Sequence, residues 1–177
     1  MNEAIRDGQA VRAELRRLAE IAAGILDGEE VKRIITDKAM HYIAQPDPQH
    51  RFLSGDYFDV DHERFLRTKK LLLRIARLGR LEVSSSVWVP VPGSDLVTVA
   101  VHNGVHHRYY TFGQEGLPAP AEMKHVLRTG RICDVEAGEG RPALLTVLAP
   151  VRDSLGDVVA VAELTAPSGA DPPPAWS

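Results

Sequence analysis

Residues 142–165, PALLTVLAPVRDSLGDVVAVAELT, constrain the fold of this chain more than any other stretch. Two runs rich in Leu, Val and Ala flank the segment RDSLGD at 152–157. Because Asp, Ser and Gly support a reversing turn without strain, the pattern predicts a β-hairpin. Each run is nearly continuous in apolar residues, so we expect both strands to lie inside a sheet that is covered on both faces.

Composition bounds the size and the partners of the protein. The 177 residues with 44% apolar content suffice for one domain with one substantial core. The formal net charge of −3, from 21 basic and 24 acidic residues, gives no general attraction to nucleic acid, so we expect no nucleic-acid partner. A single cysteine, Cys133, excludes an internal disulfide and a multi-cysteine zinc site.

Signatures of enzymes and of membrane insertion are missing from the sequence. It contains no phosphate-binding glycine loop, no nucleophile elbow and no zinc-protease helix motif, so we expect neither enzymatic activity nor a cofactor. No apolar run reaches the about 18 residues that a transmembrane helix requires, and the N-terminus lacks the pattern of a secretion signal. As written, the chain is expected to be soluble and not exported.

Apolar residues at heptad spacing predict an N-terminal helix over residues 10–27. They step by four, three, four and three positions, at Val11, Leu15, Leu18, Ala22 and Ile25. Asp27 and Gly28 form a stop and restart signal. We expect this stripe to pack on a sheet, because two to three heptads are few for an independent coiled coil. In addition, we expect the helix to contribute to a dimer of the chain.

Two further helices are expected before the sheet. The first covers 29–43 and ends before Pro46 and Pro48, which forbid its continuation. The second begins after a cap at Asp59 or Asp61, runs to about Leu78 and ends at Gly79. Its buried face carries Phe65, Leu72 and Ile75, and its opposite face carries a basic row, which is either solvated or a docking surface: Arg67, Lys70, Arg74 and Arg77.

The periodicity changes after Gly79, and β-like runs follow at 81–91, 96–103 and 105–112. Turn sequences separate these runs, which indicates antiparallel pairing. A short helix at 121–128, closed by Thr129-Gly130, leads to a strand at 131–136 and to the hairpin. The order predicts an α+β fold, an antiparallel sheet of five or six strands with the long N-terminal helices packed on one side.

The hairpin carries a resemblance to a known family. A strand ending in Ala149-Pro150-Val151, then Arg152-Asp153-Ser154, then Gly156-Asp157-Val158-Val159 resembles the closing hairpin of PAS-like or Cache-type bacterial sensor domains. The resemblance implies one sensor domain at 1–165, with a sheet region at 81–165. Residues 166–177, rich in proline, are expected to form a disordered tail.

The resemblance also implies a place in signal transduction, of the kind found in two-component systems and chemoreceptors. Such domains are commonly extracytoplasmic. The chain is therefore expected in the periplasm if it is excised from a receptor, and in the cytoplasm if it is complete as written. The expected partners are a small-molecule ligand, a signalling output domain or protein, and a second copy in a homodimer.

In PAS-like folds a ligand lies between the sheet and the segment that crosses it, which directs attention to the third β-like run. Strand alternation sets His106, Arg108 and Tyr110 on one face. An Arg fork and a Tyr hydroxyl suit an anion, which suggests a carboxylate ligand. Phe112 and His102 complete the candidate site. The alternative is that the histidines and Arg108 face solvent, while Tyr110 is an aromatic residue at the edge of the core. His102 and His106 lack a clear third ligand, so we expect no metal.

Two functions follow from this reading. The first is a sensory domain that binds a small molecule, a carboxylate in the favoured case, and transmits occupancy through its N-terminal helix or its dimer by a population shift. The alternative is a ligand-free interaction or dimerisation module of a signalling system, which docks through the heptad stripe or the basic row.

Overall fold

The predicted hairpin forms and lies inside the sheet. The structure, a computed structural model, describes residues 8–45, 60–103, 116–135 and 144–168. Strands β5 (Leu144–Arg152) and β6 (Val158–Pro167) pair antiparallel, and each has a second neighbour on its other side. Gly156, at the turn, has a φ of 88°, a left-handed conformation that favours glycine.

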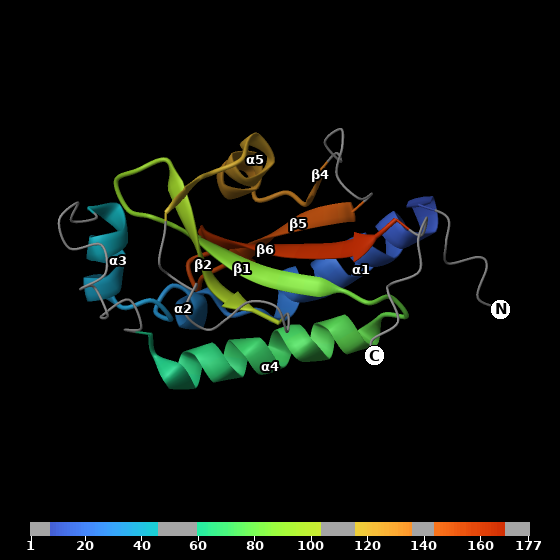
Figure 1. Cartoon of the computed structure of the whole chain (residues 1–177), viewed down its shortest axis with the longest axis horizontal. Coiled ribbons are helices and arrows are strands. Elements are labelled where there is room, and N and C mark those ends of the chain that lie inside the picture. Colours follow the sequence, from blue (N-terminus) through green and yellow to red (C-terminus); the bar gives the residue numbers. More distant parts are fainter. Residues whose placement is uncertain (1–7, 46–59, 104–115, 136–143, 169–177) are drawn as a thin grey trace, which may run out of the picture.

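Six antiparallel strands make up the described sheet, in the order β3-β2-β1-β6-β5-β4. Helices α1 and α4 lie on one face of the sheet and α5 lies on the other (Figure 1). This is the predicted α+β arrangement, an antiparallel sheet with the N-terminal helices packed on one side. The four remaining strands are β1 (Ser84–Pro90), β2 (Leu96–His102), β3 (Leu117–Pro118) and β4 (Cys133–Val135).

The N-terminal helix is confirmed as α1 (Gly8–Ile25). Its predicted stripe is buried at Val11, Leu15, Leu18 and Ala22, and it contacts β5 and β6. The last position of the stripe, Ile25, is 45% exposed. No helix in the described part of the chain is long and apolar enough to cross a bilayer.

The single helix expected at 29–43 is wrong, because the chain forms two short helices there. These are α2 (Gly28–Val31) and α3 (Asp37–Ala44). Ile34 and Ile35 lie between them and are buried, and Ile35 forms an isolated backbone bridge with Val60. Thr36 then caps α3, because its side chain accepts a hydrogen bond from the Ala39 N–H. Core burial of the two isoleucines and a favourable cap therefore outweigh helix continuity.

The next helix is confirmed as α4 (His62–Leu78). The Asp61 carboxylate caps it by accepting from the backbone N–H groups of Glu63 and Arg64, both at 3.1 Å. The buried face carries Phe65, Leu72 and Ile75, as predicted, together with Thr68. Gly79 follows the helix with an ordinary φ of −92°, and a Cβ at this position would lie 3.0 Å from Leu18 Cδ1. Gly79 therefore permits close approach of α1.

Two of the remaining strand predictions need adjustment, and one falls outside the described residues. β1 begins at Ser84 rather than at Leu81, and the third run, 105–112, lies outside the described residues. β6 continues to Pro167, past the expected start of the tail, and Ala166 is only 1% exposed because it packs in the core. The short helix is confirmed as α5 (Ala121–Thr129), ended by a left-handed Gly130 with a φ of 63°.

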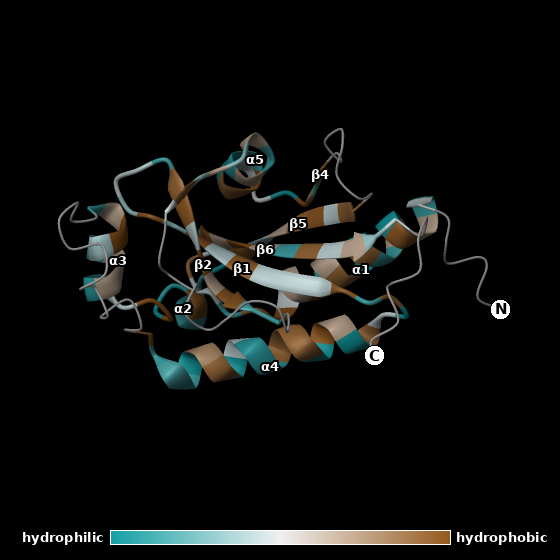
Figure 2. Cartoon of the chain, viewed as in Figure 1, coloured by the Kyte–Doolittle hydropathy of each residue, from teal (hydrophilic) through white to brown (hydrophobic). Residues whose placement is uncertain are grey.

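Two hydrophobic clusters occupy the two faces of the sheet. The larger lies under α1, α2, α3 and α4 and contains the inward side chains of all four longer strands. The smaller lies under α5. In Figure 2, β5 and the apolar part of β6 are brown, whereas the serine-rich start of β1 is pale. The smaller cluster consists of Val97, Met123, Val126, Leu148 and Val161.

The tip of the β5–β6 hairpin contacts both helical layers. On one side Lys32 Nζ lies 3.3 Å from Asp153 Oδ2, and the Ser154 hydroxyl donates to Glu29. On the other side, the Arg152 guanidinium donates to the carbonyl oxygen of Gly130, which ends α5. The turn therefore connects α2 with the end of α5.

Substituting Gly28 with Ala tests the packing of α2 against the hairpin. A Cβ there would lie 2.4 Å from the Arg152 carbonyl oxygen, so backbone must move. We expect a loss of about 1 to 3 kcal/mol in the free energy of unfolding, measured by urea denaturation. Gly24→Ala is the matched control, because nothing lies within 4 Å of its Cβ and it sits in α1. Equal stability of the two variants would contradict the packing.

The Asp153 carboxylate predicts acid sensitivity. Burial raises its pKa, but hydrogen bonds from Lys32 and from the backbone N–H groups of Leu155 and Asp157 outweigh this, so the pKa lies below its ordinary value. The ionised form therefore contributes stability above the unfolded pKa of about 3.9, and this contribution is lost as pH falls through the lower folded pKa. We expect Asp153→Asn to be less stable than the wild type at neutral pH and the difference to shrink below about pH 4. A difference independent of pH would refute this.

Candidate ligand-binding site

Polar side chains gather on the sheet face that carries α5. Alternation along β1 turns Ser84 and Ser86 toward this face, and the register places Glu163 opposite Ser86 and Thr165 opposite Ser84. His102 lies opposite Ser86 on the other neighbour, β2. Thr146 of β5 lies opposite Thr165. We call these six residues the polar patch: Ser84, Ser86, His102, Thr146, Glu163 and Thr165.

Glu163 is the charged centre of the polar patch. Its Oε2 accepts a hydrogen bond from the Ser86 hydroxyl at 2.8 Å and another from Trp88 Nε1 at 2.5 Å. Bonds to an ionised acceptor are stronger than neutral ones, so this oxygen organises the two neighbouring side chains. Among the described residues no basic side chain forms an ion pair with Glu163, and its Oε1 accepts no hydrogen bond. That oxygen is an acceptor available to a ligand.

His102 is held at the other side of the patch. Its Nε2 lies 3.2 Å from the Ser84 hydroxyl, and the residue is 9% exposed. The next residue, Asn103, fixes the end of β2 against β1. Its side-chain oxygen accepts from the Ser85 N–H at 2.8 Å and its amide donates to the Val83 carbonyl at 3.2 Å. These bonds fix the backbone that carries the imidazole.

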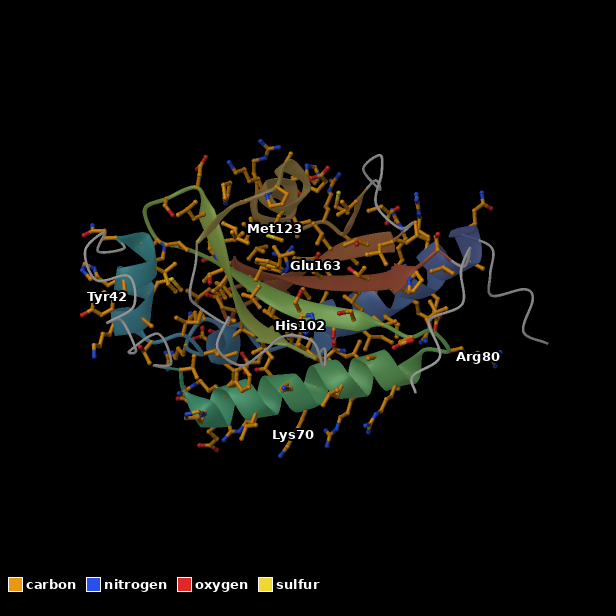
Figure 3. All side chains as sticks on the ribbon, in the orientation of Figure 1. Tyr42, Lys70, Arg80, His102, Met123 and Glu163 are labelled. Carbon is orange, nitrogen blue, oxygen red and sulfur yellow. The ribbon has the colours of Figure 1, made fainter. Side chains whose placement is uncertain are left out.

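The patch borders the smaller hydrophobic cluster. In Figure 3, Glu163 and Met123 lie on the same side of the sheet, with Met123 coming from α5. Trp88 packs against this cluster and also donates to Glu163, so it joins the apolar part to the polar part. Cys133 also packs there, and burial raises the pKa of its thiol, with the charges of Glu122 and Asp134 adding to the shift. A thiol at neutral pH is a weak nucleophile, so Cys133 contributes packing.

Of the predicted site residues, the structure brings one into the patch, namely His102. The other four, His106, Arg108, Tyr110 and Phe112, lie outside the described residues. In the described ranges no three His, Cys, Asp or Glu side chains are arranged to hold a metal ion.

Sequence reasoning missed Ser86, Trp88 and Glu163. One signal pointed to them, since Glu163 is the only charged residue in the run VVAVAELTA. A lone charge inside an interior strand requires a polar partner on the same face. The sequence does not show that β1 is the neighbour that supplies it.

Comparisons with known proteins give only distant likenesses. No family model matches the chain, and no curated protein matches it. The inducer-binding domain of the transcription factor PobR from Acinetobacter, in complex with 3-hydroxybenzoic acid, is 12% identical, with a TM-score of 0.40 over 62% of this chain and 86% of that one. The sensory domain of the Campylobacter jejuni chemoreceptor Tlp3 is 11% identical, with a TM-score of 0.41 over 90% of this chain. The match spans 61% of the chemoreceptor domain. These values are too low to transfer a ligand to this chain.

Two substitutions of Glu163 test its role in ordering the patch. Glu163→Ala leaves the Ser86 hydroxyl without its acceptor, and Ser86 is only 4% exposed. Trp88 Nε1 loses its shorter bond and keeps only the one to the Ser86 hydroxyl oxygen, at 3.1 Å. We expect a loss of about 1 to 3 kcal/mol in the free energy of unfolding, measured by urea denaturation followed by circular dichroism. Glu163→Gln retains an acceptor oxygen and is expected to lose less than half as much. Equal losses would contradict this, because they would show that the acceptor oxygen retained by Gln does not stabilise the patch.

Proposed function

We propose that this chain is a sensory domain, PAS-like and of the Cache type, that binds a small molecule on the α5 face of the sheet and catalyses no reaction. The observation that carries the proposal is the Glu163 cluster. A half-buried carboxylate is held there by Ser86 and Trp88, with one oxygen left for a further donor. Small-molecule sites typically combine an apolar lining with a few placed polar groups, and the patch borders such an apolar cluster.

The ligand that we propose is a small carboxylate that also carries a hydrogen-bond donor. The carboxylate end rests on Arg108, His106 and Tyr110, as predicted from their alternation in the sequence. A second negative charge next to Glu163 would be repelled, so the end of the ligand that meets the patch presents a donor such as a hydroxyl group. Trp88 and Met123 offer apolar contact beside the patch.

Transmission of occupancy is proposed to run through β6 to α1, or through a dimer that α1 forms. β6 carries Glu163 on the α5 face and Ala162 and Leu164 on the opposite face, where both are fully buried in the larger cluster. α1 packs on β5 and β6 at this cluster. A ligand that binds more tightly to one position of β6 therefore shifts the population toward the arrangement of α1 that accompanies this position.

A thermal-shift screen of small carboxylates, with and without hydroxyl groups, tests the proposal. A ligand at about 100 times its dissociation constant stabilises by about 2.7 kcal/mol, which is about 5 to 10 °C for a domain of this size. We expect a saturable shift that Arg108→Ala abolishes and Glu163→Gln weakens. Arg33→Ala is the control, because Arg33 is exposed and lies next to α2, away from the patch. No shift across the panel would reject the sensory function in favour of a ligand-free interaction module.

A further inference from the structure

The outer side of α4 carries a row of basic side chains. Phe65, Leu72 and Ile75 point into the core, so residues half a turn away point outward. Lys70, Arg74 and Arg77 occupy that side at spacings of four and three residues, and all three are exposed. We name these three residues the outer ridge. Figure 3 shows Lys70 directed away from the sheet, on the side of the molecule opposite to Met123 of α5.

Ion pairing distinguishes the outer ridge from the first half of the same helix. Arg64 and Arg67 form ion pairs with Glu30, and each also pairs with an acidic residue near the start of α4. No carboxylate of the described residues lies within ion-pair distance of the outer ridge. Like charges at spacings of three and four residues destabilise a helix, so the uncompensated row has a small intrinsic cost. A negatively charged surface against this side of α4 would remove that cost.

Exposed leucines border the ridge at both ends. Leu66 lies one turn before Lys70 and is 51% exposed, and Leu78 directly follows Arg77 and is 57% exposed. Large apolar side chains next to basic ones suit the boundary between lipid headgroups and acyl chains. The leucines reach the apolar layer there, while the long cationic side chains stay at the phosphates.

We propose that the outer ridge of α4 docks on an anionic lipid surface by contacts with phosphate groups. The ridge follows the convex outside of a straight helix and extends about 10 Å from Lys70 to Arg77. A lipid surface requires no matching shape, and such a convex row favours it over the groove or pocket that a folded protein partner would fill. The formal net charge of the chain is −3, so the attraction depends on this local row of charges and not on the charge of the whole molecule.

This inference goes beyond sensing and does not depend on it. α4 and α5 lie on opposite faces of the sheet, so a membrane under α4 leaves the polar patch and α5 turned away from the lipid (Figure 1). A ligand from solution then still reaches the α5 face while the domain is bound.

Co-sedimentation with vesicles tests the docking. The probes are vesicles of phosphatidylcholine alone and vesicles of an equal mixture of phosphatidylcholine and phosphatidylglycerol. We expect binding to the anionic vesicles only, and release when salt rises from about 0.1 M to about 1 M, where the screening length falls from about 10 Å to about 3 Å. Each basic side chain near such a surface contributes about fivefold, so the triple variant K70Q/R74Q/R77Q is expected to bind roughly a hundredfold more weakly.

The matched control is K124Q/R128Q/R131Q. It also removes one lysine and two arginines, and so the same charge, from exposed positions on and after α5, where Lys124 is paired with Asp95. We expect this variant to bind the anionic vesicles within about twofold of the wild type, since charges beyond a screening length contribute little. Equal weakening of the two variants would overturn the proposal in favour of a general charge effect. Failure of the wild type to bind would overturn it too and leave an acidic protein as the partner of α4. Melting temperatures of both variants show that each is folded.

Discussion

The packing of α1 on β5 and β6 is the interaction on which the rest of the structure depends. The inward side of β6 carries mainly small residues, with Ala160, Ala162 and Ala166 beside a single Leu164. Small side chains in a central strand allow a helix to approach closely, and Leu15 and Leu18 of α1 are fully buried there. Once this layer forms, β1 and β5 flank β6 and bring the N-terminal and C-terminal halves of the chain into one sheet.

The two helical layers are connected at the tip of the same hairpin. On the α1 side of the sheet, Asp153 forms an ion pair with Lys32. On the other side, the Arg152 guanidinium donates a hydrogen bond to the carbonyl oxygen of Gly130 at the end of α5. Exposed ion pairs stabilise little, but Asp153 has only 6% of its side chain exposed and also accepts two backbone N–H groups of its own turn. These contacts join the end of α5 to α2 through the tip of the hairpin, outside the core.

The α5 face differs chemically from the α1 face. On the α1 side the strands present almost only apolar residues, whereas on the α5 side the apolar cluster ends at Trp88 and the polar patch begins. Burying a carboxylate such as Glu163 is unfavourable unless donors satisfy it, and here Ser86 and Trp88 supply them to one oxygen only. A sheet that served only as a scaffold could carry apolar residues in place of Ser86 and Glu163 together, without a buried polar group to satisfy, which is why we connect the patch with binding.

The sequence by itself determined the local structure. Heptad spacing specified α1, the Asp61 cap and Gly79 bounded α4, and the RDSLGD turn defined the hairpin, because each of these depends on residues that are near neighbours in the chain. Only the tertiary structure decided that the expected 29–43 helix divides around Ile34 and Ile35, since their burial depends on what packs over them. It also decided the polar patch. Ser86 and Glu163 are 77 residues apart, and the register that places them side by side follows from strand pairing across the whole sheet.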